Sequence, residues 1–154
     1  MTSWQGKAAL ALRLVLGAVF VYAAWSKLRQ PWALFALSIY AYGLLPEPAV
    51  IAVARTLPWA ELLLGVLLAS GRFLRVSAGA ASALLVFFFA VMIRSYFKGL
   101  QIDCGCFGVG EALSWRTLAR DATFLAASLA LTLLAFRRPQ PARTAETGGL
   151  PARP

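Results

Sequence analysis

Apolar residues are gathered into four long runs, and polar residues lie mostly between these runs. The runs predict membrane-spanning helices at about residues 8–26, 49–70, 76–94 and 116–136. The third run carries no charge from Val76 to Ile93, and a helix of that length crosses the hydrocarbon core of a bilayer. The pattern therefore predicts an all-α, polytopic membrane protein, built as a four-helix transmembrane bundle.

A shorter apolar segment, Pro31–Leu45, lies between the first two runs and is closed by Pro46 and Pro48. It is too short to span a bilayer, so it predicts a short interfacial or re-entrant helix. The first run has the length and basic flank of a signal peptide, but Arg13 interrupts it and further spans follow. We therefore expect this run to be retained as the first span.

One transmembrane domain is expected over residues 1–136, followed by a tail at residues 137–154. The tail is rich in Pro, Arg, Thr and Gly, a composition that predicts disorder. Four spans place both ends of this domain on one side of the membrane. That side carries slightly more Lys and Arg than the other, which predicts cytoplasmic termini by the positive-inside rule. The loop between the third and fourth spans then faces the periplasm or the cell exterior.

The composition supports a membrane protein and excludes several kinds of site. Hydrophobic residues make up 60% of the chain and charged residues 14%, against about 45–50% and about 25% in soluble domains. The net charge is +9, but the basic residues flank the apolar runs, which fits anionic lipid headgroups and argues against nucleic acid. The absence of histidine excludes His-ligated haem, His-based zinc sites and Cys-His nucleophilic pairs.

The only two cysteines, Cys104 and Cys106, are separated by a single glycine in the predicted outer loop. A disulfide between residues so close requires a tight turn, which Gly105 permits. Such a bridge is strained and exchanges readily, so on the oxidising side of a membrane the pair is typical of a thiol–disulfide exchange site. The alternatives are a structural bridge, an inert reduced pair, and a metal site completed by a second chain.

Three ionisable residues fall inside the predicted spans: Arg13, Arg55 and Glu61. Charges at membrane depth are unfavourable and usually face the bundle interior in pairs. Because the spacing of Arg55 and Glu61 does not place them on one helix face, we expect an ion pair between Arg13 and Glu61. This pair has either a structural role or a role in quinone binding or proton relay.

Tryptophan and tyrosine residues are concentrated near the predicted outer surface. They are Trp25, Trp32, Trp59, Trp115, Tyr40, Tyr42 and Tyr96. Their position predicts an interfacial aromatic belt, with a ring-lined pocket for a quinone or lipid as the alternative.

Several motifs resemble those of the MauE/DoxX-like membrane proteins, in the same order along the chain. In the first span the resemblance lies in Arg13, Gly17, Phe20 and Lys27. Further on it lies in Tyr42-Gly43-Leu44-Leu45-Pro46 and in Leu57-Pro58-Trp59-Ala60-Glu61-Leu62 with Gly65. The segment Asp103-Cys104-Gly105-Cys106-Phe107-Gly108 resembles the cysteine motif of the MauE branch. The resemblance runs from about Arg13 to the fourth span.

This resemblance implies a four-helix protein of the bacterial inner membrane. MauE proteins are linked to methylamine utilisation, where they are thought to help mature the disulfide-rich small subunit of methylamine dehydrogenase with a thioredoxin-like partner. DoxX-type relatives are linked to quinone-coupled sulfur oxidation. The resemblance therefore makes a membrane quinone the expected cofactor, and no metal or haem is expected.

The leading hypothesis is a membrane component of a thiol–disulfide pathway. Cys104 and Cys106 would exchange electrons with an exported thioredoxin-fold protein, and the bundle would pass them to or from a quinone, in maturation of a client such as a dehydrogenase subunit. One thiol attacks and the other resolves the mixed disulfide, and the sequence leaves open which is which. The alternatives are a non-catalytic assembly factor and a small-solute or lipid transporter that depends on the ionisable residues of the spans.

Overall fold

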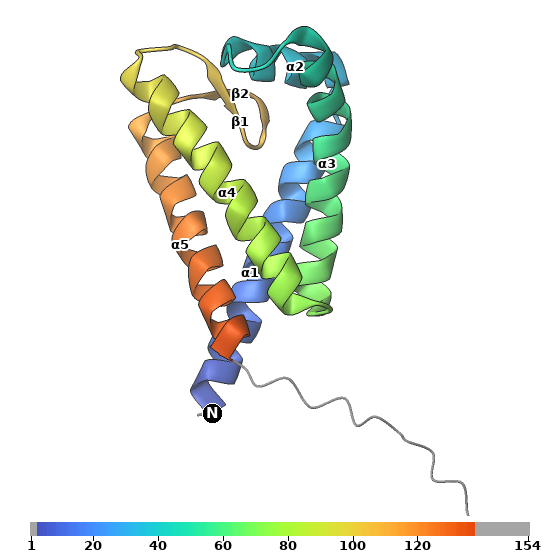
Figure 1. Ribbon diagram of the computed structural model, residues 1–154, viewed down its shortest axis with the longest axis vertical. Coiled ribbons are helices and arrows are strands. Elements are labelled where there is room, and N and C mark those ends of the chain that lie inside the picture. The colour runs from blue at the N-terminus through green and yellow to red at the C-terminus, as the bar shows by residue number, and fades with distance from the viewer. Residues whose placement is uncertain (1–2, 138–154) are drawn as a thin grey trace, which may run out of the picture.

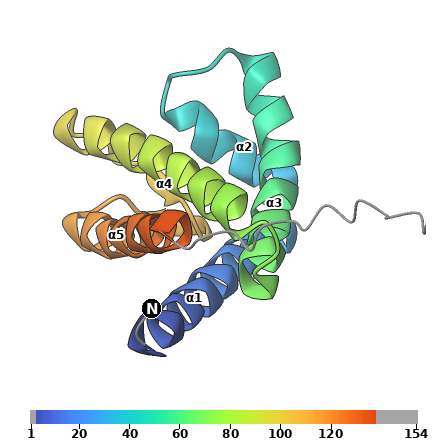
Figure 2. The same cartoon turned by 60° about the horizontal axis from the view of Figure 1, so that its bottom comes forward.

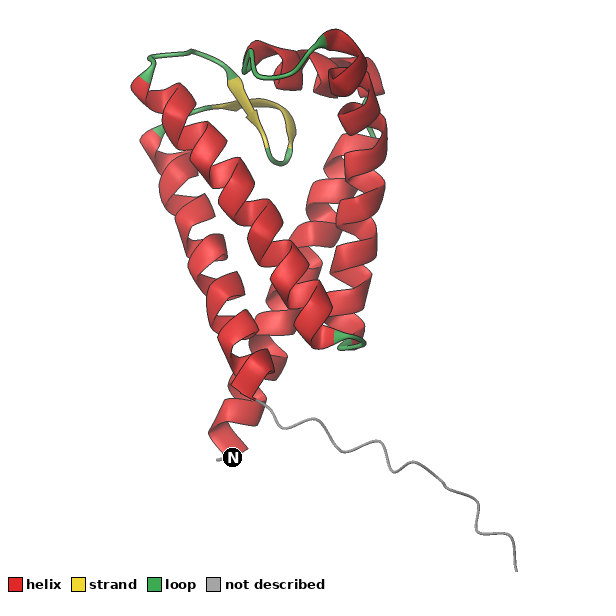
Figure 3. Cartoon of the chain, viewed as in Figure 1, coloured by secondary structure: helices red, strands yellow, loops and turns green. Residues whose placement is uncertain are grey.

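The computed structural model describes residues 3–137. The predicted disordered tail, residues 137–154, lies outside the described residues except for Arg137, which ends the last helix. The described elements, in chain order, are α1 Ser3–Leu28, α2 Trp32–Ala41, α3 Glu47–Ser70, α4 Leu74–Phe97, β1 Asp103–Gly105, β2 Gly108–Ala112 and α5 Trp115–Arg137. Figure 3 shows that helices dominate this part of the chain and that its strands form one small hairpin.

Four helices are long and apolar enough to cross a membrane: α1, α3, α4 and α5. They cover the four predicted spans, and α2 is the short helix predicted between the first two. Large apolar side chains such as Leu63, Phe87 and Leu133 are exposed on their outer faces, where a bilayer would cover them. The prediction of an all-α, multi-pass membrane bundle is confirmed, while the compartment that each end faces stays a prediction.

Proline and glycine set the ends of α3, where the chain reverses direction. The helix begins directly after Pro46 and carries Pro48 in its first turn, where no amide donor is needed. It ends at Ser70 and is capped by Gly71, whose left-handed φ of 70° lets its amide donate to the carbonyls of Leu67 and Leu68. The sequence thus places the reversals of the chain through proline, whose backbone φ is fixed, and glycine, which adopts the left-handed conformation without strain.

The helices α1 and α3 run antiparallel, and small residues let their backbones approach closely (Figure 1). A Cβ added at Gly17 would lie 2.9 Å from the carbonyl oxygen of Gly65, and a Cβ added at Gly65 would lie 2.9 Å from the carbonyl oxygen of Gly17. Membrane helices gain little from burying apolar side chains against each other, so close backbone packing holds them together. The two glycines therefore set the crossing of α1 and α3.

The second helical pair consists of α4 and α5, which lie side by side in Figures 1 and 2. Ser82 on α4 donates a hydrogen bond to Ser128 on α5 at 3.2 Å, and its hydroxyl lies 2.9 Å from that of Thr132. Hydrogen bonds of this kind between membrane helices contribute about 0.6 kcal/mol on average. This pair is therefore held by polar contacts as well as by packing.

The two helical pairs meet at one end of the bundle and diverge toward the other (Figure 1). At the end where they meet, called the converging end below, Leu16, Leu68 and Leu131 are almost completely buried. At the opposite end, called the hairpin end, β1 and β2 enter the space between the pairs and α2 lies across the opening. The loop that carries both cysteines is thus folded into the bundle.

Candidate functional site

The strands β1 and β2 form an antiparallel hairpin with Cys106 and Phe107 at its tip. Gly105 pairs with Gly108 across the turn, and both have left-handed φ values, 71° and 92°. Other residues adopt these values only with strain, so glycine is required at both positions. Gly105 therefore makes the tight turn that the sequence predicts.

Both cysteines are free thiols held inside the bundle. Cys104 is only 3% exposed, and Cys106 is half-buried. The Cys106 sulfur lies 3.6 Å from the sulfur of Met92 on α4 and 3.8 Å from the carbonyl oxygen of Cys104. The pair does not stand free in an outer loop, and only the fold of that loop brings helix residues against the thiols.

A buried ion pair joins α1 to α3 beside the hairpin tip. The ammonium of Lys27 lies 2.8 Å and 2.7 Å from the two carboxylate oxygens of Glu61, and the two residues are 4% and 5% exposed. Lys27 also donates a hydrogen bond of 2.7 Å to the backbone carbonyl of Cys106. The ion pair therefore holds the tip of the hairpin as well as the two helices.

The predicted ion pair between Arg13 and Glu61 is wrong. Because α1 and α3 are antiparallel, a residue early in α1 meets the end of α3, and a residue late in α1 meets its middle. Arg13 accordingly lies against Gly71 at the converging end, where a Cβ on that glycine would meet its guanidinium. The Nε of Arg13 is buried and has no hydrogen-bond partner within the described part of the chain. Lys27 takes the position that the prediction assigned to Arg13.

Arg55, the third ionisable residue of the predicted spans, lies apart from this pair. Its guanidinium stacks over the ring of Trp32, 4.4 Å from the ring centre, and so joins α3 to α2. A cation over a tryptophan face is stabilising without a carboxylate partner. Of the three predicted residues, only Glu61 lies beside the hairpin.

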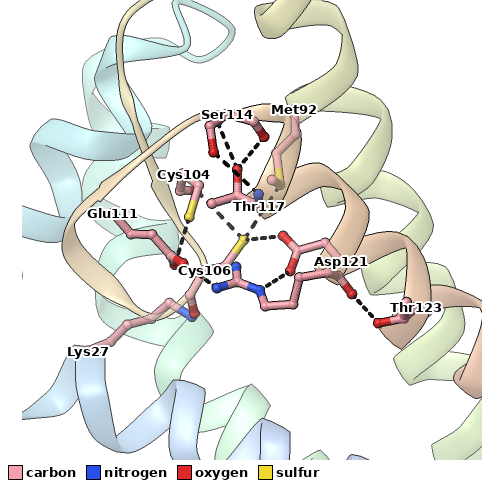
Figure 4. A network of polar contacts seen from close by, with 10 residues as sticks. Lys27, Met92, Cys104, Cys106, Glu111, Ser114, Thr117, Asp121 and Thr123 are labelled. Carbon is pink, nitrogen blue, oxygen red and sulfur yellow. Dashed lines mark hydrogen bonds and ion pairs between the residues drawn. The ribbon is translucent and has the colours of Figure 1, made fainter.

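Figure 4 shows that each thiol faces a carboxylate of its own. The Cys104 sulfur donates a hydrogen bond to Glu111 on β2, and the Cys106 sulfur donates one to Asp121 on α5, both at 3.4 Å. Arg120 joins the two carboxylates, because it bonds Asp121 through Nε at 3.0 Å and pairs with Glu111 through Nη1. The site thus contains two thiols, two carboxylates and one shared guanidinium.

The two thiols differ in acidity. Interaction with the Cys106 side chain lowers the pKa of Cys104, although burial and the charge of Glu111 oppose this effect. The same interaction raises the pKa of Cys106, and burial and the charge of Asp121 act in the same direction. Cys104 is therefore the thiol that loses its proton first.

A second side chain anchors the hairpin from the region of α2. The phenol of Tyr42 donates a hydrogen bond of 2.9 Å to the backbone carbonyl of Cys104. Burial is the main cause that raises the pKa of Tyr42, so the phenol stays a donor at neutral pH. Together with Lys27, Tyr42 satisfies the carbonyl groups on both sides of Gly105.

A narrow apolar cleft lies beneath the hairpin tip. Its walls carry the aromatic side chains Phe20, Phe88, Phe89, Phe107 and Phe124, and Cys106, Asp121 and the Lys27–Glu61 pair supply its polar atoms. Cys104 does not border it. Only one of the two sulfurs therefore faces this cleft.

The rings around the cleft are not the Trp and Tyr residues singled out in the sequence. Trp25, Trp59 and Trp115 are exposed, as an interfacial belt requires, and Tyr42 donates a hydrogen bond to the hairpin. The residues that the sequence left unassigned are Lys27, Glu111, Arg120 and Asp121. They all lie at the same end of the predicted spans as the cysteines, and this shared position could have identified them as candidates for the site. Among residues 3–137, no group of three or more Cys, Asp or Glu side chains is arranged to hold a metal ion.

Comparison with known proteins gives a consistent result. Residues 5–135 match the family described as "Methylamine utilisation protein MauE". The chain is similar to the methylamine utilization protein MauE of Paracoccus denitrificans, at 36% identity over 124 residues, which cover 79% of this chain and 66% of that relative. It is also similar to the protein of the same name from Paracoccus versutus, at 39% identity over 144 residues, covering 91% and 77%. No solved structure matches the chain.

Proposed function

The chain belongs to the MauE family, which is linked to methylamine utilisation, and from this premise we propose that it is a membrane component of a thiol–disulfide pathway. In this role Cys104 and Cys106 exchange electrons with an exported protein of thioredoxin fold. The observation that supports this proposal is that both thiols lie on one tight hairpin, each within hydrogen-bond distance of its own carboxylate. Inert core thiols need neither feature.

The exchange proceeds in two steps that use the two thiols differently. The Cys104 sulfur, which loses its proton more readily, attacks a disulfide of the partner, so that a mixed disulfide forms and one partner thiolate leaves. The Cys106 sulfur then attacks Cys104, which closes the Cys104–Cys106 disulfide and releases the second partner thiolate. Two electrons pass to the partner, and the reverse sequence oxidises it. Because Cys104 is buried, the hairpin must open toward the partner during the first step.

A membrane quinone is the proposed lipid-soluble partner of the thiol pair. The flat ring of a quinone suits a narrow cleft walled by Phe88, Phe89 and Phe124, and the cleft places Cys106 at its edge. A bound quinone supplies a two-electron, two-proton acceptor. The protein's own part is to exclude water from Cys106 and to keep Asp121 within hydrogen-bond distance of its sulfur.

The proposed client is a protein that depends on correct disulfides, such as the small subunit of methylamine dehydrogenase. The support is the family's link to methylamine utilisation together with a thiol site at one end of the bundle. On this proposal, the bacterial inner membrane holds the protein with its hairpin end toward the periplasm.

The proposal is tested by trapping thiols in intact membranes that carry the single variants Cys104→Ser and Cys106→Ser. Samples are quenched in acid, alkylated and separated without reductant. We expect a reductant-sensitive adduct with an exported protein in Cys106→Ser, because the attacking Cys104 remains and nothing resolves the mixed disulfide. The Cys104→Ser variant should show none, and the double variant is the matched control.

Other outcomes separate the alternatives. An adduct in Cys104→Ser alone would keep the exchange reaction and reverse the roles of the two cysteines. If neither variant forms an adduct and the wild-type pair never changes redox state, the exchange function is excluded. Activity that survives in the double variant would then favour a non-catalytic assembly factor.

A further inference from the structure

Each thiol of the hairpin donates its hydrogen to a separate carboxylate. Glu111 accepts from Cys104 within the same hairpin, and Asp121 accepts from Cys106 across to α5, at the same distance of 3.4 Å. The contact between Cys104 and Glu111 runs across the two paired strands of the hairpin. The contact between Cys106 and Asp121 forms where the hairpin meets α5 (Figure 4).

Oxidation of two thiols to a disulfide releases two protons as well as two electrons. Cys104 and Asp121 are buried, at 3% and 7% exposed, whereas the side chain of Glu111 is 34% exposed and connects the site to solvent. The nearest acceptor for a proton leaving either sulfur is therefore a carboxylate of the protein. Ionised carboxylates accept hydrogen bonds and protons but cannot donate, which suits them to this task.

We propose that Glu111 and Asp121 are catalytic residues that take the protons of Cys104 and Cys106 respectively as the sulfurs react. Arg120 is a positioning residue, because it bonds both carboxylates and partly neutralises their charge. Its guanidinium also lies 4.5 Å from the ring centre of Phe107 at the hairpin tip, which ties its position to that of the hairpin. The inference rests on the thiol–disulfide exchange proposed above.

The proton transfers complete the balance of the two exchange steps. As Cys104 forms its bond to the partner's sulfur, its proton passes to Glu111, and the departing partner thiolate takes up a proton from solvent. As Cys106 closes the internal disulfide, its proton passes to Asp121, and the second partner thiolate is protonated likewise. Two electrons reach the partner, and the net number of protons is unchanged once both carboxylates release theirs.

In the resting site the hydrogen of each sulfur points to a carboxylate oxygen. The negative charges of Glu111 and Asp121 oppose a free thiolate beside them, although for Cys104 the contact with Cys106 outweighs this effect and lowers the pKa. On this proposal each proton passes to its carboxylate as a sulfur–sulfur bond forms, which is general-base catalysis.

The remaining charged and titratable groups around the hairpin have other partners. Lys27 on α1 pairs with Glu61 on α3 and binds a backbone carbonyl. Tyr42 also binds a backbone carbonyl, and Asp103 accepts from the amide of Gly110. The residue of α4 that touches a thiol, Met92, does not titrate. Within the described residues, only Glu111 and Asp121 accept a hydrogen bond from a thiol through a carboxylate.

The test measures how fast the purified full chain in nanodiscs reduces hydroxyethyl disulfide, a small neutral disulfide whose charge does not change with pH. Remaining thiols are counted by mass-tagging after acid quench, between about pH 5 and pH 9. We expect Asp121→Asn and Glu111→Gln each to slow the reaction about a hundredfold at neutral pH. This factor is the lower end of the rate enhancement that a general base typically contributes. Their rates should rise about tenfold per pH unit, because hydroxide then removes the proton, whereas the wild-type rate depends weakly on pH.

Conservative and control variants separate catalysis from a loss of structure. Asp121→Glu and Glu111→Asp should recover part of the rate and the shallow pH profile, and Glu47→Gln, an exposed carboxylate at the start of α3, should behave as wild type. Wild-type rates in Asp121→Asn and Glu111→Gln, or equal losses at every pH, would overturn the inference while exchange itself stands. Absence of exchange in the wild-type protein would instead remove the proposed function.

Discussion

The two ends of this bundle are held together by different forces. At the converging end, α1 and α3 touch through glycine backbones, and the core is made of fully buried leucines. At the hairpin end, the two helical pairs stand apart; an ion pair joins α1 directly to α3, and hydrogen bonds join the hairpin to α1 and α5. The converging end is therefore stabilised by close packing, and the hairpin end by ion pairs and hydrogen bonds.

This difference matches what each end has to do. Close backbone packing is rigid and has few alternative arrangements. A polar network around a hairpin can be opened and remade, and it keeps reactive groups near the sulfurs. The bundle thus combines a rigid end, which positions the helices, with a hairpin end that carries the chemistry.

The largest expected effect comes from breaking the ion pair at the hairpin end. Lys27→Met leaves Glu61 buried without a counter-charge, and we expect the free energy of unfolding to fall by about 3–5 kcal/mol. Denaturant titration in mixed micelles measures it. The double variant Lys27→Met, Glu61→Leu should recover most of the loss, and Lys7→Met, at an exposed position of α1, should have no effect. A double variant as unstable as the single one would mean that the carbonyl contact to Cys106, not the ion pair, dominates.

At the converging end, stability should be sensitive to added side-chain volume, because α1 and α3 are in backbone contact there. Gly65→Ala places a methyl group 2.9 Å from the Gly17 carbonyl oxygen, so we expect a loss of about 1–3 kcal/mol from overpacking. Gly79→Ala on α4 is the matched control, since a Cβ there meets nothing within 4 Å. Unfolding in mixed micelles checks both variants. Equal stability of the two would show that α1 and α3 do not rely on backbone contact at this crossing.

The smallest expected effect is the loss of one hairpin anchor. Tyr42→Phe removes the hydrogen bond to the Cys104 carbonyl, which we expect to weaken the closed hairpin by about 1 kcal/mol. Alkylation of Cys104 by a maleimide should then become about fivefold faster, because the hairpin opens more often. Tyr40→Phe is the control, since Tyr40 is 59% exposed. An unchanged alkylation rate would show that other contacts alone hold the hairpin closed.

The hydrophobic pattern was sufficient to predict the four spans and the short helix between the first two, and the residue motifs were sufficient to indicate the family. Span length and apolar character are local properties, because the bilayer acts on each helix separately. The tight turn at Gly105 was predictable for a similar reason, since it depends on the backbone freedom of one residue. The cysteines stood out as candidates because of their spacing alone.

The partners of charged residues were not predictable in the same way. Arg13 lies inside the predicted first span and Lys27 directly after it, and nothing in their local sequence says which one reaches Glu61. That choice depends on the antiparallel offset of α1 and α3, which the crossing at Gly17 and Gly65 determines.

The sequence by itself determined that this chain crosses a membrane four times and carries one cysteine pair in a connecting loop. Only the tertiary structure decided that the loop folds back between the helices and that Glu111 and Asp121 each meet a thiol. The physical reason is that burial and hydropathy act along a segment, whereas hydrogen bonds and ion pairs depend on the relative placement of segments far apart in the chain.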